Sequence, residues 1–164
     1  MLEIIAFCCG ALVMVLEMVG ARVLAPHVGT SAVVWTSLIG VVLACLAVGA
    51  WLGGRLADRH LSRRGLAFIL TGAALGSALA AGTHRLVGET LSVAITDIHL
   101  AAVACALGIL ALPALCCGMI SPYIIRLRIR DVATSGATVG RLYALSTAGS
   151  IVGTFLGGFV LISF

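Results

Sequence analysis

The chain has 164 residues, of which 62% are hydrophobic and 10% are charged, and its formal net charge is +4. This composition leaves too little polar surface to cover a water-soluble globule. Several apolar runs reach the roughly 20 residues that a helix needs to cross a hydrocarbon core about 30 Å thick. We therefore expect an all-α integral membrane protein, with one transmembrane domain over residues 1–164 and no nucleic-acid partner.

The first two predicted helices cover residues 2–24 and 33–52. A turn is expected between them, at the Pro-His-Val-Gly-Thr segment that begins at Pro26. The first apolar run carries Glu3 where a secretory signal would carry positive charge, and it continues to Leu24. We therefore interpret it as a retained transmembrane helix.

A short basic segment, Gly54 to Arg64, follows the second helix and is predicted to be a turn. An acid near a helix end can bind an adjacent helix N-terminus and an arginine, and so latch one conformation. The alternative is that the arginines only set orientation and contact anionic lipid. The candidate latch residues are Asp58, Arg59, Arg63 and Arg64.

The other three helices are predicted at residues 66–83, 100–125 and 142–164. Between the third and fourth, charged residues alternate with apolar ones at helical spacing. We interpret this segment as an interfacial helix around residues 85–98, or as the start of the fourth helix. Pro113 and Pro122 are expected to bend the fourth helix.

The arginines predict the orientation of the chain. Eight of the ten basic residues follow the second and fourth helices: Arg55, Arg59, Arg63, Arg64, Arg126, Arg128, Arg130 and Arg141. The opposite side carries only Arg22 and Arg85. Because arginine-rich loops stay in the cytoplasm, we expect a cytoplasmic N-terminus and an external C-terminus. All ten basic residues are arginine, which fits a bacterial source and thus the bacterial inner membrane.

Two rows of small residues at four-residue spacing predict close helix contacts. They are Gly72, Gly76 and Ala80, then Gly149, Gly153 and Gly157. Small residues let membrane helices approach closely. We expect these rows to serve tight packing or dimerisation. The six cysteines all lie in apolar runs, and we interpret them as small buried side chains.

Glu17 is the foremost candidate for a functional group. A carboxylate inside a membrane helix is costly unless it is paired, protonated or hydrated. Arg22 lies about 140° around the same helix and is not its natural partner. Glu17 is predicted to bind a cation, couple protons or contact a substrate; the alternative is that it is neutral or pairs with an arginine of another helix.

Other polar residues are secondary candidates. His27, Glu89, Asp97 and His99 are expected near the outer face, where with Glu17 they form a vestibule or serve as ordinary interfacial groups. No two of them have a diagnostic metal-ligand spacing, so no metal and no cofactor is predicted.

A polar row on the fifth predicted helix is a further candidate for solute contact. It consists of Tyr143, Thr147, Ser150 and Thr154. Such a row lines a polar cavity or hydrogen-bonds to neighbouring helices.

Three blocks of sequence carry a family resemblance: residues 17–31 with 34–40, residues 53–59, and residues 118–123 with 140–154. They resemble the membrane domain of transmembrane spermidine-synthase-like proteins, which are fused major-facilitator/spermidine-synthase proteins. The resemblance implies a half-major-facilitator-like bundle. The family's aminopropyltransferase-like domain is absent here, so no catalytic activity is expected of this chain alone. Leu61 stands where the general transporter loop has glycine.

Three functions remain open at this point. The first is a transporter-like half module that pairs with itself or a partner to move a small solute, possibly a cation or amine. The second is a membrane anchor or substrate-handling partner of a separate spermidine-synthase-like enzyme. The third is a structural subunit of a larger membrane complex.

Overall fold

The computed structural model describes residues 1–129 and 135–161. Within these ranges the chain forms only helices: α1 (Leu2–Val28), α2 (Ala32–Arg59), α3 (Arg63–Ala94), α4 (Ile98–Arg128), α5 (Ser135–Phe155) and a short π-helix, η2 (Leu156–Leu161). Five helices of this described part, with α5 and η2 counted as one, are long and apolar enough to cross a membrane. The all-α prediction with five spanning helices is confirmed.

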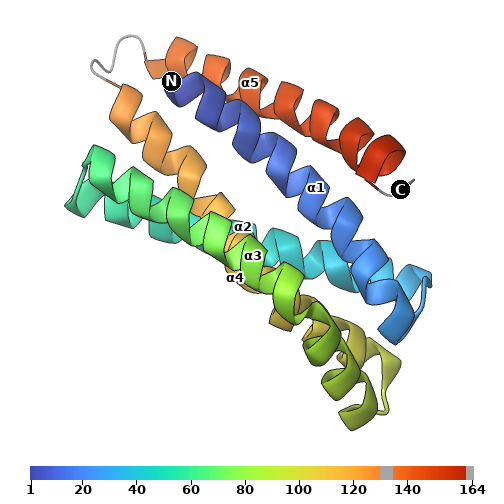
Figure 1. Cartoon of the computed structure of the whole chain (residues 1–164). Coiled ribbons are helices and arrows are strands. Elements are labelled where there is room, and N and C mark those ends of the chain that lie inside the picture. The colour runs from blue at the N-terminus through green and yellow to red at the C-terminus, as the bar shows by residue number, and fades with distance from the viewer. Residues whose placement is uncertain (130–134, 162–164) are drawn as a thin grey trace.

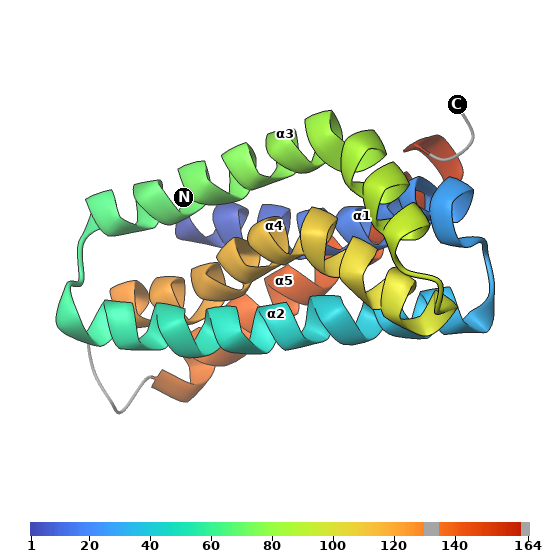
Figure 2. The same cartoon turned by 90° about the horizontal axis from the view of Figure 1, so that it is seen from below.

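The helices form two groups that are in contact with each other. α1 packs along α5, whereas α2 and α3 both pack on α4 (Figure 1). α1 also contacts α4 and so joins the two groups. Figure 2 shows the N-terminus at the same end of the bundle as the α2–α3 connection, with the end of α5 and η2 at the opposite end. α4 is the central helix, since it carries the largest number of buried side chains.

Glycines allow the closest helix contacts in both groups. A Cβ added at Gly149 would clash with the carbonyl oxygen of Phe7, and one at Gly153 with that of Ala11. From the other side, a Cβ at Gly10 would clash with the carbonyl oxygen of Ser146. The α1 and α5 backbones therefore touch directly, which only residues without a side chain permit.

The remaining small residues of the two rows also lie at contacts within the chain. A Cβ at Gly157 would lie 3.2 Å from Cβ of Met18 in α1. On α3, a Cβ at Gly76 would lie 3.1 Å from the backbone of Pro113, and one at Gly72 would lie 3.3 Å from Sγ of Cys116. These surfaces are thus occupied by α1 and α4 of the same molecule.

The predicted helix positions are right, but most of the predicted helices are too short. α1 continues through Pro26 to Val28 and ends where Gly29 adopts a positive φ of 81°. α2 continues to Arg59 because Gly53 does not break it but fits against Met119 of α4. α5 begins at Ser135, before the predicted residue 142. Residues 130–134 and the predicted end of the last helix, residues 162–164, lie outside the described ranges.

The separate interfacial helix predicted around residues 85–98 is wrong. These residues form the last part of α3, up to Ala94, and α4 starts only at Ile98. Val87 and Leu91 pack against the buried core of α2 and α4, so tertiary packing extends α3 past its polar residues. A Cβ at Gly108 of α4 would lie 2.8 Å from a methyl group of Val87, which shows how closely the two helices meet there.

The predicted basic turn over Gly54 to Arg64 is also wrong in extent. Only residues 60–62 lie outside helices, because α2 ends at Arg59 and α3 begins at Arg63. Ser62 caps α3 by accepting a hydrogen bond from the backbone N–H of Gly65 at 2.9 Å. Most of the arginines in this segment therefore project from helix ends and not from a loop.

Candidate functional site

A groove of about 300 Å³ lies between the α1–α5 pair and the α2–α4 pair. We call it the central groove. The groove is lined by Ala6, Cys9, Gly10 and Val13 of α1, by Leu46 and Ala50 of α2, and otherwise by residues of α4 and α5. No contact joins α2 to α5 within the described residues, so the groove has no wall between these two helices.

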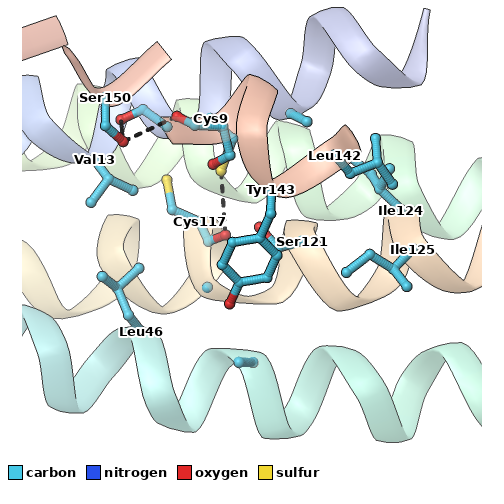
Figure 3. A pocket seen from close by; sticks show the side chains of 15 residues that line it. Cys9, Val13, Leu46, Cys117, Ser121, Ile124, Ile125, Leu142, Tyr143 and Ser150 are labelled. Atoms are coloured by element: carbon cyan, nitrogen blue, oxygen red, sulfur yellow. Dashed lines mark hydrogen bonds between the residues drawn. The ribbon is translucent and has the colours of Figure 1, made fainter. Parts of the chain in front are cut away.

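Four hydroxyl groups line the central groove. They belong to Ser121 of α4 and to Tyr143, Ser146 and Ser150 of α5. Figure 3 shows the Tyr143 ring extending from α5 in front of α4, with its hydroxyl directed towards α2. The Ser150 hydroxyl donates to the carbonyl oxygens of Gly10 at 3.2 Å and Ser146 at 3.1 Å.

The other three hydroxyls have no hydrogen-bond partner among the described residues. Tyr143 is 66% exposed, and Ser121 is exposed as well, so both are accessible from outside the helix bundle. A hydroxyl can donate one hydrogen bond and accept two. The groove thus offers several free donors and acceptors on an otherwise apolar surface.

Two cysteines lie on the α1 and α4 sides of the groove. The thiol of Cys9 contacts the carbonyl oxygen of Cys117 at 3.5 Å, and both residues are buried (Figure 3). No disulfide forms among the described residues. The pair packs α1 against α4. The interpretation of the cysteines as small buried side chains is right for Cys9, Cys45, Cys105 and Cys117 but wrong for Cys8, which is exposed; Cys116 is half-buried.

Glu17 lies on the same face of α1 as the groove. It follows Gly10 by seven residues, which places the two within about 20° around the helix, and it follows Val13 by about one turn. One turn further on, Gly20 lies against Leu38 of α2 and Leu110 of α4, whereas Gly10 lies against Ser146 of α5. Glu17 itself does not line the groove but lies on α1 beyond Val13. Glu17 is half-buried and pairs with no arginine in the described part of the chain.

The polar residues predicted to form an outer vestibule do not gather around Glu17, and only Asp97 and His99 lie next to each other. His27 lies ten residues, or about 15 Å, beyond Glu17 on α1, and its ring packs against Gly88 of α3. Glu89 and Arg22 are exposed. Nowhere in residues 1–129 and 135–161 do three His, Cys, Asp or Glu side chains gather as a metal ion would require.

Asp97 has a structural role that the sequence analysis did not assign. Its carboxylate accepts hydrogen bonds from the backbone N–H groups of His99 at 2.9 Å and Leu100 at 3.0 Å, which caps α4. These bonds, above all the one from Leu100, hold the pKa of this exposed carboxyl below its usual value. The His99 imidazole lies 3.5 Å away and adds to this effect when it is protonated.

The polar row on α5 divides into two parts. Tyr143 and Ser150 line the groove, whereas Thr147 and Thr154 are exposed outside it. Thr154 donates to the carbonyl oxygen of Ser150 at 2.9 Å within its own helix. Ser146 and Ser121 were missed; Ser146 lies three residues after Tyr143 and four before Ser150, a spacing that could have identified it.

Ion pairs join the helix ends at the arginine-rich end of the bundle. Asp58 pairs with Arg126 of α4 at 3.3 Å. Glu3 pairs with Arg128 at 3.8 Å and Arg141 at 3.4 Å, and so connects the ends of α1, α4 and α5.

The predicted latch residues act differently from the prediction. Asp58 binds an arginine, but one from α4 and not one of its sequence neighbours. It does not cap α3, because Ser62 does so. Arg59, Arg63 and Arg64 are exposed and form no ion pair within the described ranges.

Comparison with models of protein families, with curated proteins and with solved structures gives no match. The structure itself defines a class: an all-helical chain with five helices suited to a membrane and a hydroxyl-lined groove between two helix groups.

Proposed function

We propose that this chain is a transporter-like half module that binds a small solute, a cation or an amine, in the central groove. The observation that carries the proposal is the combination of unpartnered hydroxyls in the groove with Glu17 on the same face of α1. Hydroxyl oxygens accept hydrogen bonds from an ammonium group, and a carboxylate supplies the opposite charge. A solute of this kind would satisfy groups that otherwise have no partner.

The open side of the groove supports the idea of a half module. Because α2 and α5 do not touch, the groove would face lipid if the chain stood alone. Polar groups exposed to hydrocarbon without hydrogen bonds are unfavourable. A second copy of the chain, or another membrane subunit, would cover the groove and complete a pathway for the solute.

The arginine distribution supports an orientation as part of the same proposal. Seven described arginines lie at the end that holds the N-terminus: Arg55, Arg59, Arg63, Arg64, Arg126, Arg128 and Arg141. By the positive-inside rule this end is cytoplasmic, in a bacterial inner membrane. The resemblance to the membrane domain of spermidine-synthase-like proteins agrees with an amine as the solute.

The proposal is tested by uptake into sealed proteoliposomes that contain the full chain. Radiolabelled putrescine and spermidine serve as probes. Glu17→Gln should abolish uptake, because it removes the carboxylate from the groove face while keeping its size. Glu89→Gln is the matched control, since Glu89 is exposed and lies on α3, away from the groove.

Each outcome of this experiment decides something. Uptake by the unchanged chain and by Glu89→Gln, but not by Glu17→Gln, supports the proposal. Equal uptake by Glu17→Gln and the unchanged chain would refute the role of Glu17. Absence of uptake of both amines by the unchanged chain would refute the choice of solute class.

A further inference from the structure

A second cavity, of about 250 Å³, lies between α1, α3 and α4 at the arginine-rich end of the bundle. None of its lining residues lines the central groove. We call it the α1–α3 slot. Arg63 provides the one charged side chain of its lining; the other lining residues are Met1, Leu2, Ile5, Leu66, Ala67, Leu70 and Leu127.

Arg63 differs from three arginines of α4 and α5 at this end of the bundle. Arg126, Arg128 and Arg141 each pair with a carboxylate of the chain. Arg63 is exposed and has no such partner in the described residues, yet it borders the slot. It is also the first residue of α3, where the helix dipole adds positive potential.

The slot has the order of groups that a phospholipid presents. From Arg63, the α3 lining continues to Leu66 and Ala67 and then to Leu70, so the apolar wall runs about 10 Å along the helix, away from the charge. The cavity is smaller than the roughly 300–1,000 Å³ of sites that enclose whole small molecules. It therefore suits part of an acyl chain with the rest of the lipid outside.

We propose that the α1–α3 slot binds one anionic phospholipid, with its phosphate at Arg63 and an acyl chain along Leu66 and Leu70. The unpaired guanidinium favours a headgroup with net negative charge over a zwitterionic one. The apolar wall favours a lipid over a free phosphate ion, because only the lipid brings apolar surface to bury. This inference is independent of what the central groove binds.

The test measures lipid binding to the full chain in mild detergent by native mass spectrometry. The probes are phosphatidylglycerol and phosphatidylcholine with identical acyl chains. The unchanged chain should bind phosphatidylglycerol about fivefold more tightly, the change expected for one basic residue near an anionic lipid. Arg63→Gln should remove this preference. Arg64→Gln is the matched control, because Arg64 has the same charge and is also exposed but does not line the slot.

Two further arms separate the slot from general attraction by the basic surface. Ala67→Trp keeps the charge but fills the slot, and it should weaken binding of both lipids. Inorganic phosphate at the same concentration as phosphatidylglycerol should not displace the lipid. Arg63→Lys keeps the charge and should retain the preference, which shows that loss in Arg63→Gln does not reflect misfolding.

The proposal is overturned by any of three results. Equal preference for phosphatidylglycerol in Arg63→Gln and Arg64→Gln would show that Arg63 is not the headgroup site. Unchanged lipid binding by Ala67→Trp would show that the slot holds no acyl chain. Displacement of the lipid by inorganic phosphate would identify a site for the free ion.

Discussion

The hydroxyl of Tyr123 in α4 donates a hydrogen bond to the carbonyl oxygen of His60, 2.8 Å away, in the connection between α2 and α3. The same hydroxyl oxygen accepts a hydrogen bond from the backbone N–H of Ser62 at 3.1 Å. Tyr123 is fully buried, so these backbone groups obtain from one side chain what water would otherwise provide. One phenol thus holds the tight α2–α3 connection against the central helix.

Tyr123→Phe should destabilise the protein by about 1–3 kcal/mol, because two hydrogen bonds to the backbone of residues 60 and 62, each of about 0.5–1.5 kcal/mol, are lost. The measurement is the midpoint of thermal unfolding in detergent. Tyr143→Phe is the matched control, since its ring is 66% exposed and its hydroxyl has no partner in the described part of the chain. Equal midpoints for the two variants would contradict the role given to Tyr123.

Gly149→Ala should loosen the α1–α5 contact, because the new methyl group meets the carbonyl of Phe7. Overpacking of this kind typically costs about 1–3 kcal/mol. Gly140→Ala in the same helix has no heavy atom within 4 Å of the added Cβ. Since alanine favours helix more than glycine does, it should be neutral or stabilising by up to about 1 kcal/mol.

Thermal unfolding of the two alanine variants distinguishes these effects. A lower midpoint for Gly149→Ala together with an unchanged or higher midpoint for Gly140→Ala supports direct backbone contact between α1 and α5. A loss of stability in Gly140→Ala as large as that in Gly149→Ala would contradict it.

The Asp97 cap should make the start of α4 sensitive to acid. Its pKa is lower in the folded chain than the ordinary value of about 3.9. A carboxyl group whose pKa is lowered by folding stabilises the folded chain at every pH above its ordinary, unfolded pKa. This contribution is lost as the pH falls through the pKa of the folded chain. Stability should therefore decline below about pH 4, and Asp97→Ala should remove this part of the decline.

Hydrogen exchange of the first turn of α4 reports this effect directly. The backbone N–H groups of His99 and Leu100 should exchange faster in Asp97→Ala than in the unchanged chain. In Asp97→Asn, which keeps a capping oxygen, they should exchange more slowly than in Asp97→Ala. Identical exchange in both variants would show that the side chain does not cap the helix.

The sequence predicted well which long apolar runs form helices. It predicted the ends of these helices poorly, because those ends depend on packing against other helices. Residues 84–94 carry Arg85 and Glu89, which favoured a separate surface helix, but Val87 and Leu91 face the core and extend α3. The second helix was likewise expected to end at residue 52, yet α2 continues through Gly53, which lies closely against Met119 of α4. Neither contact can be derived from local composition, since each depends on which helix lies opposite.

The candidate site was predictable only in part. Tyr143 and Ser150 share a helix face with Ser146, so the α5 side of the groove follows from helical spacing. Ser121 joins them from α4, which needs the relative placement of two helices far apart in sequence. Asp97 was taken for a site residue because a cap and a binding carboxylate look alike in sequence.

The central claim is that the groove beside α5 is open to water and binds an amine. It is tested by placing one cysteine in a variant whose six native cysteines are replaced by alanine. Ser146→Cys lies in the groove, and Ile151→Cys lies on the outer face of the same helix, where it is 55% exposed. In sealed vesicles a charged thiol reagent should label Ser146→Cys but not Ile151→Cys, and spermidine should slow that labelling. Absence of labelling at Ser146→Cys, or labelling that spermidine leaves unchanged, would contradict the claim.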